Sequence, residues 1–239
     1  MPHLASHVLL TRVPMSDIFV TRHEKGAWTD DVVEALERVL SNGGNAGRPA
    51  FESELLRCDL LYLARDADGP RAFLFVARVR LPVGPERREA RYLGLSAARD
   101  EESGGAVLEQ FAADARDEEQ SRGRRLLLFT TAGTPFAVRT AHDFWADVQP
   151  ARDASFRAEV LPLADAARAW LGATGGAQCP FALPRLAGCG ADWRRMVDEG
   201  HSTTGEYFRQ LGVEQARGER LLLLCSVPAR DRGFSAQAA

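Results

Sequence analysis

The chain has 239 residues, of which 45% are hydrophobic and 26% are charged. This is the composition of an ordinary soluble globular protein, and the length is sufficient for one sizeable domain. The net charge of −3 gives no general attraction to nucleic acid or to an anionic membrane. No apolar run approaches the ~20 residues that span a bilayer, and the N-terminus lacks the segments of a secretory signal. We therefore expect a cytoplasmic protein that does not bind membranes.

The first half of the chain predicts two helices and several strands. Thr29 and the two aspartates after it are typical of a helix start, and apolar residues follow with helical spacing up to Leu40. Two apolar runs separated by a turn at 66–70 are typical of a hairpin, and a second turn at 82–85 leads to another strand. We expect a strand over 17–21, helices over 29–40 and 50–57, and strands over 59–65, 72–79 and 90–98.

The segment 89–131 predicts a strand, a glycine turn, a helix and a second strand. Residues 101–106 contain two adjacent glycines and are expected to turn the chain into the helix. The apolar run 126–131 is typical of a buried strand. A glycine turn at a helix start presents free N–H groups and a positive dipole end, which suit a phosphate or pyrophosphate. The apolar face of the helix contains Val107, Leu108, Phe111, Ala112 and Ala115.

This order of elements resembles the core of the GNAT acyltransferases, the general-control-type N-acetyltransferase superfamily, over roughly residues 17–147. In that family a turn with the pattern Gln/Arg-x-x-Gly-x-Gly/Ala holds the pyrophosphate of acyl-CoA, and Glu101-x-x-Gly104-x-Ala106 occupies the matching positions here. Glu101 replaces the family's amide or basic residue. The resemblance implies an α/β fold with a GNAT-like mixed sheet, in which an antiparallel meander precedes a strand–helix–strand unit. It also implies an N-acyltransferase that uses acyl-CoA as cosubstrate.

The resemblance further implies which residues contact the donor. The strand around Leu95 would bind the pantetheine arm as an added strand, and Gly94 would permit its close approach. The glycine turn would bind the phosphates, and Arg99 could supply the positive charge that the motif lacks. The alternative for these segments is an ordinary core strand and a tight turn before a surface helix. The expected cofactor-binding residues are Leu95, Ala97, Arg99, Ser103, Gly104, Gly105 and Ala106.

Acyl transfer to an amine requires a neutral amine, a stabilised oxyanion and a proton for the leaving group. In the GNAT family a helix with the pattern Asn-x-x-Ala-x-x-x-Tyr often supplies that proton from its tyrosine. In the helix predicted from Pro135 to about Trp145, the matching residues are Thr134, Ala137 and Ala141, so the Asn and the Tyr are missing. The candidate acid–base groups are therefore Tyr207 first and His142 second, with His201 and Glu89 as further candidates.

Residues 147–218 are expected to be a helical insertion before the last strand, within one domain over 1–229. Ser202 is typical of a helix start and Gly212 of a helix end, and 220–227 is a strongly apolar final strand. The tail over 230–239 has no apolar periodicity and is expected to be disordered. Within the insertion we expect helices over 163–171, 193–199 and 202–212 and a short strand over 180–185.

The four cysteines are far apart in the sequence and form no C-x-x-C pair, so we expect reduced thiols and no metal site. Cys179, Cys189 and His201 are the residues that could be assembled into a partial zinc site.

Five arginines surround one predicted hairpin, at positions 78, 80, 87, 88 and 91. They are either a solvated face or a docking patch for a phosphate-rich donor. The main expectation is an enzyme that transfers an acyl group from acyl-CoA to the amine of a small molecule or peptide. Two alternatives stay open beside it. One is the same fold with aminoacyl-tRNA or an acyl carrier protein as donor. The other is a non-catalytic binding module. The sequence does not determine the oligomeric state.

Overall fold

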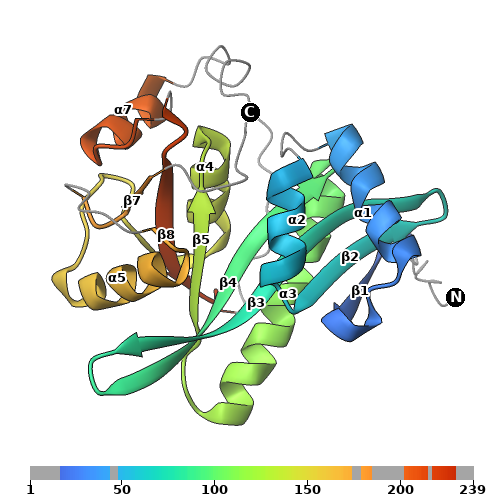
Figure 1. Ribbon diagram of the computed structural model, residues 1–239, viewed down its shortest axis with the longest axis horizontal. Helices are drawn as coiled ribbons and strands as arrows, with labels where there is room; N and C mark the ends of the chain where they lie inside the picture. The colour runs from blue at the N-terminus through green and yellow to red at the C-terminus, as the bar shows by residue number, and fades with distance from the viewer. Residues whose placement is uncertain (1–16, 44–47, 174–178, 185–201, 215–216, 230–239) are drawn as a thin grey trace, which may run out of the picture.

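The computed structural model describes residues 17–43, 48–173, 179–184, 202–214 and 217–229. These residues form an α/β fold around one open, mixed sheet of eight strands (Figure 1). The strands are β1 (Phe19–Glu24), β2 (Leu60–Asp66), β3 (Gly69–Val83), β4 (Glu86–Ala98), β5 (Leu127–Ala132), β6 (Ala146–Gln149), β7 (Ala182–Leu183) and β8 (Arg220–Ser226). Their order in the sheet is β1-β2-β3-β4-β5-β8-β6, and β7 pairs with β8. β4 and β5 pair in parallel, whereas the other pairs are antiparallel.

Helices cover both faces of the sheet. The α-helices are α1 (Asp30–Gly43), α2 (Arg48–Arg57), α3 (Glu101–Arg122), α4 (Pro135–Phe144), α5 (Leu161–Trp170) and α7 (Ser202–Gln210), with short 3-10 helices η1 (Lys25–Ala27) and η2 (Ala158–Val160). No helix among the described residues is long and apolar enough to cross a membrane.

Aromatic side chains show which helix covers which face. Phe51 of α2 packs against Phe73 and Phe75 of β3, with ring centroids 6.5 and 5.9 Å apart. Phe111 of α3 packs against Tyr62 of β2, at 5.6 Å. Tyr62 pairs with the residue between the two β3 phenylalanines, and neighbouring residues of a strand point to opposite faces. α2 and α3 therefore lie on opposite faces of the sheet, as Figure 1 also shows.

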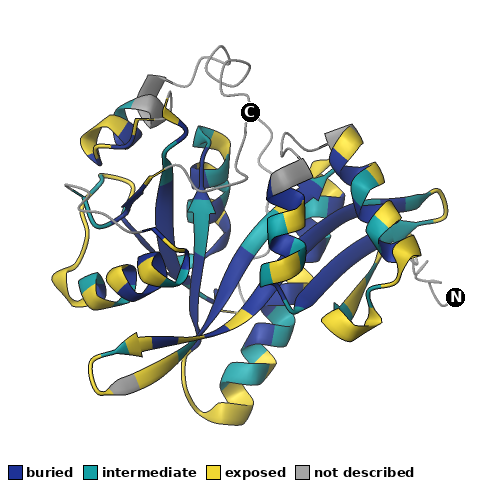
Figure 2. Ribbon diagram, viewed as in Figure 1, coloured by how far each residue is buried: buried dark blue, intermediate teal, exposed yellow. Residues whose placement is uncertain are grey.

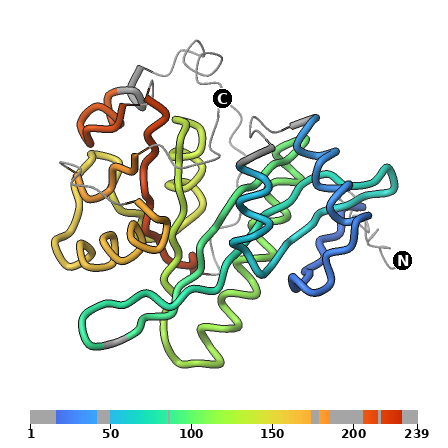
Figure 3. Tube along the Cα trace, viewed as in Figure 1, coloured from blue at the N-terminus to red at the C-terminus, as the bar shows by residue number. Residues whose placement is uncertain are grey.

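The hairpin of β3 and β4 is longer than the sequence predicted. The turn is Gly84-Pro85, where Gly84 has a φ of +61° that suits glycine. The outer parts of both strands were missed because exposed residues such as Pro82, Arg87 and Arg88 interrupt the apolar pattern. Figure 2 shows that this end of the hairpin is exposed, and Figure 3 shows it extending past the body of the molecule.

The parallel strands β4 and β5 diverge part of the way along their length. They pair where Ala90–Leu93 lies opposite Leu127–Thr130, and beyond these residues Figure 1 shows them separating. β4 continues beside β3, whereas β5 continues beside β8. The sheet therefore opens between its two central strands.

A β-bulge marks the point of divergence. The register of β3 against β4 shifts so that Gly94 and Leu95 of β4 lie opposite the single residue Phe75 of β3. A bulge of this kind bends its strand and increases the local twist. The bulge therefore explains why β4 turns away from β5 here.

The α/β fold with a mixed sheet is confirmed, as are most of the predicted helices and strands, to within a few residues at their ends. One prediction is wrong, because residues 101–106 are not a glycine turn and α3 already begins at Glu101. The strand β6, over Ala146–Gln149, was not predicted and lies at the start of the proposed insertion of about 147–218. The predicted helix 193–199 and the predicted disordered tail 230–239 lie outside the described residues.

Candidate functional site

A buried carboxylate lies on the bulge where β4 leaves β5. Glu54 of α2 is 7% exposed, and its Oε2 atom lies 2.1 Å from the position that a Cβ atom would take at Gly94. Any side chain at position 94 would therefore collide with this carboxylate. Glycine at the bulge allows Glu54 to rest directly on the backbone of β4.

The carboxylate of Glu54 is held by three neighbours. The Tyr92 hydroxyl donates to Oε1 at 3.2 Å, the Cys58 thiol donates to Oε2 at 3.2 Å, and the Arg57 guanidinium lies 3.5 Å from Oε1. Burial and the nearby Glu54 raise the pKa of both Tyr92 and Cys58. Both groups therefore stay protonated near neutral pH and serve as hydrogen-bond donors to the carboxylate.

Aromatic rings enclose this cluster on the side of α5. The ring centroids of Tyr92, Phe129 and Trp170 lie between 5.1 and 5.5 Å apart. The Arg57 guanidinium lies over two of these rings, 5.8 Å from Tyr92 and 5.5 Å from Trp170. Such cation–π contacts hold the guanidinium beside Glu54. The three rings, from β4, β5 and α5, thus form an apolar wall next to the ion pair of Glu54 and Arg57.

Arg220 is a second charged group at the opening. It begins β8, and its Nη1 atom lies 3.5 Å from the Thr131 hydroxyl of β5. Its positive charge also acts on the Tyr92 hydroxyl, together with the charges of Glu54 and Arg57. The Nε atom of Arg220 is buried and has no hydrogen-bond partner among the described residues. A buried N–H without an acceptor is costly, so this donor is suited to a ligand oxygen.

The start of α3 is not an empty anion site. The Asp100 carboxylate caps the helix, because Oδ1 accepts from the Ser103 N–H at 2.8 Å. This hydrogen bond is the main cause of the lowered pKa of Asp100. Glu101 and Glu102 follow in the first turn, so three carboxylates surround the N–H groups that the sequence assigned to a phosphate. A pyrophosphate here would have to displace the Asp100 side chain.

The two glycines of the motif are part of the helix. A Cβ atom at Gly104 would lie 3.2 Å from the Ala98 Cβ of β4, whereas nothing lies within 4 Å of one at Gly105. Gly104 thus serves the close packing of α3 against β4, and Ala106 follows it in the second turn of α3.

The other predicted donor-binding residues lie at the end of β4. Leu95 is half-buried in the bulge, and Ala97 is buried opposite Phe73. Arg99 is exposed, and its N–H donates to the Arg71 carbonyl at 2.9 Å. The structure therefore gathers all seven predicted residues at one place, where the end of β4 meets the start of α3. Their binding of a donor stays a prediction.

The two predicted acid–base groups, His142 and Tyr207, are brought together although 65 residues separate them. The His142 Nε2 atom lies 3.5 Å from the Tyr207 hydroxyl, which donates to the Pro150 carbonyl at 2.9 Å. Burial raises the pKa of Tyr207, and burial together with the charge of Arg152 lowers the pKa of His142. The pair lies just beyond β6, the last strand of the sheet and two places from β5.

We expect the Tyr207→Phe variant to lose about 1 kcal/mol of stability, since it loses the hydrogen bond to the Pro150 carbonyl. If Tyr207 also protonates the leaving group, turnover should fall by about 10² as well. Thermal unfolding and turnover measured on the same preparation separate these roles. Unchanged turnover would restrict Tyr207 to packing, and unchanged stability would contradict the hydrogen bond described above.

The further candidates do not join this site. Glu89 lies in an ion-pair network with Arg122 and Arg124 near the β3–β4 hairpin. His201 and Cys189 lie outside the described residues, so the partial zinc site stays untested. Within the described ranges no group of three potential metal ligands occurs.

Sequence reasoning missed the most enclosed part of the site. Glu54 and Arg57 are on a short helix with no recognisable motif, and Arg220 is the first residue of a strand that was recognised only by its apolar residues. The one available signal was Gly94, a glycine inside a strand, which often marks close approach by another group. That group is a side chain of the protein itself.

No protein-family profile matches this chain, and no curated protein sequence matches it. Among solved structures, a conserved protein of unknown function from Enterococcus faecalis V583, described as a probable N-acyltransferase, is similar with a TM-score of 0.39 and 12% identity. The match covers 53% of this chain and 32% of that protein's chain, so this chain spans about a third of its length. A likeness of this degree carries no information about function.

Proposed function

We propose that this protein is an N-acyltransferase that moves an acyl group from a thioester to an amine at the opening between β4 and β5. The observation that carries the proposal is the buried Glu54 carboxylate on the bulge at Gly94, where a Cβ would lie 2.1 Å from its Oε2 atom. A thioester that extends along the unpaired side of β4 would bring its carbonyl group close to this carboxylate. The Nε–H group of Arg220, which has no hydrogen-bond partner in the described part of the chain, supplies a donor at the same opening.

The proposed reaction assigns a role to each group. Glu54 takes the proton of the attacking amine, whose nitrogen forms a bond to the thioester carbonyl carbon. Arg220 stabilises the oxyanion that forms on the carbonyl oxygen. The C–S bond then breaks, and the thiolate receives the proton that Glu54 took from the amine, while the Tyr92 hydroxyl keeps its hydrogen bond to the Glu54 carboxylate. The products are an amide and a free thiol, and the protein returns to its starting state.

Acyl-CoA is the donor that we propose, with its pantetheine arm along Gly94–Ala98 and its phosphates near Arg99. The three carboxylates at the start of α3 oppose this donor electrostatically. These carboxylates favour a donor that places no pyrophosphate here, such as an acyl group on a carrier protein or on tRNA. They are also compatible with the second alternative, a module that binds a ligand without catalysis. One titration distinguishes these alternatives.

We expect Glu101→Arg to tighten CoA binding roughly 2- to 30-fold, because it removes one repulsive charge pair and adds one attractive pair, each worth about 0.2–1 kcal/mol at an exposed site. Isothermal calorimetry with CoA measures this directly. Glu109→Arg, an exposed position further along the same helix, has the same charge change and should leave the affinity near that of the wild type. Absence of CoA binding in every form would exclude acyl-CoA and favour the carrier-protein or tRNA donor.

A further inference from the structure

A cavity of about 240 Å³ lies where the outer part of the β3–β4 hairpin meets the end of α3. It is separate from the opening between β4 and β5. α3 has 22 residues, which corresponds to roughly 33 Å from its acidic start to this end. The cavity is lined by Arg87, Arg88, Glu89, Glu118, Glu119, Arg122, Arg124, Arg125 and Leu126.

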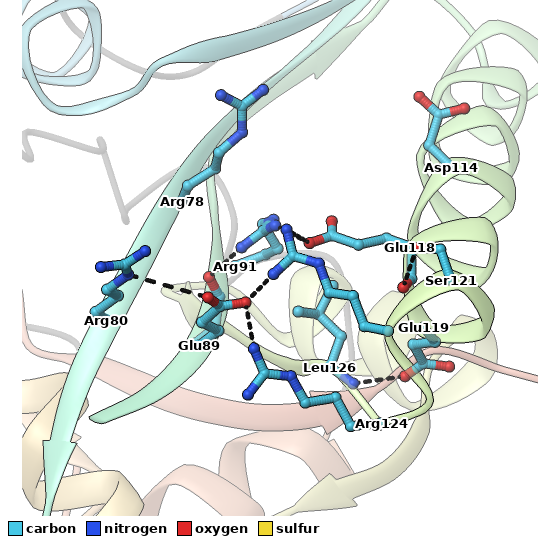
Figure 4. A network of polar contacts seen from close by, with 12 residues as sticks. Arg78, Arg80, Glu89, Arg91, Asp114, Glu118, Glu119, Ser121, Arg124 and Leu126 are labelled. Atoms are coloured by element: carbon cyan, nitrogen blue, oxygen red, sulfur yellow. Dashed lines mark hydrogen bonds and ion pairs between the residues drawn. The ribbon is translucent and has the colours of Figure 1, made fainter. Parts of the chain in front are cut away.

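The glutamates of this cavity already have partners, as the close view in Figure 4 shows. Glu89 pairs with Arg122, with Arg124 at 2.9 Å and with Arg80 at 4.0 Å. Glu118 pairs with Arg91 and with Arg122. Glu119 accepts a hydrogen bond from the Leu126 N–H at 2.7 Å. A single carboxylate shared by three guanidinium groups leaves positive charge uncompensated.

The surplus charge belongs chiefly to Arg87 and Arg88. Both side chains are exposed, and no described carboxylate lies within ion-pair distance of either. Arg125 pairs with Asp147 at 3.2 Å, but both side chains are more than half exposed, so this pair is weak. The cavity therefore presents guanidinium N–H groups that can donate hydrogen bonds to an anion.

We propose that this cavity binds a ligand carrying two or more phosphate groups. The planar fork of a guanidinium group matches two phosphate oxygens at once. Arg87 and Arg88 belong to the hairpin strand that lines the cavity, and Arg87 shares the strand face of Glu89, whereas Arg122, Arg124 and Arg125 lie on the end of α3 and the segment after it. The hairpin and the end of α3 both carry positive charge, so they can bind successive phosphates from two sides. The proposal does not depend on the acyltransferase assignment, because the two sites lie at opposite ends of α3.

The test measures binding of pyrophosphate, ATP and a short single-stranded RNA to the full chain at low ionic strength. We expect micromolar-range binding of at least one probe and a loss of roughly 100-fold or more in Arg87→Glu/Arg88→Glu, since each hydrogen bond to a charged group is worth about tenfold or more. The matched control is Arg157→Glu/Arg217→Glu, which makes the same charge change at two exposed arginines elsewhere. The control should bind like the wild type.

The three probes distinguish the source of the phosphates. Binding of pyrophosphate and ATP indicates a small ligand. Binding of RNA alone, with an affinity that falls steeply with salt, indicates a polymer. Failure of the wild-type protein to bind any probe, or an equal loss in both double variants, would overturn the proposal. With acyl-CoA as the donor, acyl transfer by Arg87→Glu/Arg88→Glu should stay at the wild-type level.

Discussion

Replacing Glu54 by glutamine should lower the rate of acyl transfer by about 10²–10⁴, the usual contribution of a general base. Glutamine has the same shape and can still accept the hydrogen bond from the Tyr92 hydroxyl, which lies 3.2 Å from Oε1. The variant should therefore fold and bind donor normally. Release of free thiol from acyl-CoA in the presence of a panel of amines measures the rate.

The control for this variant is Glu52→Gln, on the exposed side of the same helix, which should have wild-type activity. A purely structural role for Glu54 would change the melting temperature and the Michaelis constant rather than turnover. A Glu54→Gln protein with full turnover would refute the assignment of the base.

Replacing Gly94 by alanine should destabilise the protein by about 3 kcal/mol, at the upper end of the cost of overpacking. The new Cβ atom would lie 2.1 Å from the Glu54 carboxylate, and the displaced carboxylate would lose its hydrogen bonds to Tyr92 and Cys58. For a chain of this length the loss corresponds to a fall in melting temperature of roughly 6–12 °C. Acyl transfer should fall with it, because Glu54 leaves its position.

A double-mutant cycle separates this collision from a general intolerance of side chains in β4. Glu54→Ala removes the group that the new Cβ atom meets, so the effects of Gly94→Ala and Glu54→Ala should not add. Gly26→Ala is the control, because nothing lies within 4 Å of a Cβ atom there, and it should be nearly neutral. Additive effects in the cycle would show that the close contact is not what makes glycine necessary at position 94.

The elements that sequence reasoning placed correctly have strong apolar periodicity or clear end signals. Thr29 accepts the first backbone hydrogen bonds of α1 through its carbonyl oxygen, as expected of a residue at a helix start. Gly212 lies just past α7 with a φ of +65°, as expected of a glycine at a helix end. The central β4–α3–β5 unit was also recognisable, because its helix has one apolar face and β5 begins with a continuous apolar run.

The parts that were missed depend on contacts between residues far apart in the sequence. Residues 101–106 were interpreted as a turn because of Gly104 and Gly105, but the Asp100 cap outweighs the low helix propensity of two glycines. The partners of Glu54 on β4 lie about 40 residues away along the chain. Neither spacing nor composition indicates that a lone glutamate on a ten-residue helix is buried against a bulge.

Hydrogen–deuterium exchange of the wild-type protein, with and without saturating acyl-CoA, measures whether the donor pairs with the backbone of β4. A thioester that pairs with the free side of β4 would take up backbone N–H groups there, and phosphates near Arg99 would protect the start of α3. We expect slower exchange in peptides that cover Gly94–Ala98 and Glu101–Ser103, with no change in β1 and β2. Donor binding without slower exchange in Gly94–Ala98 would contradict this pairing.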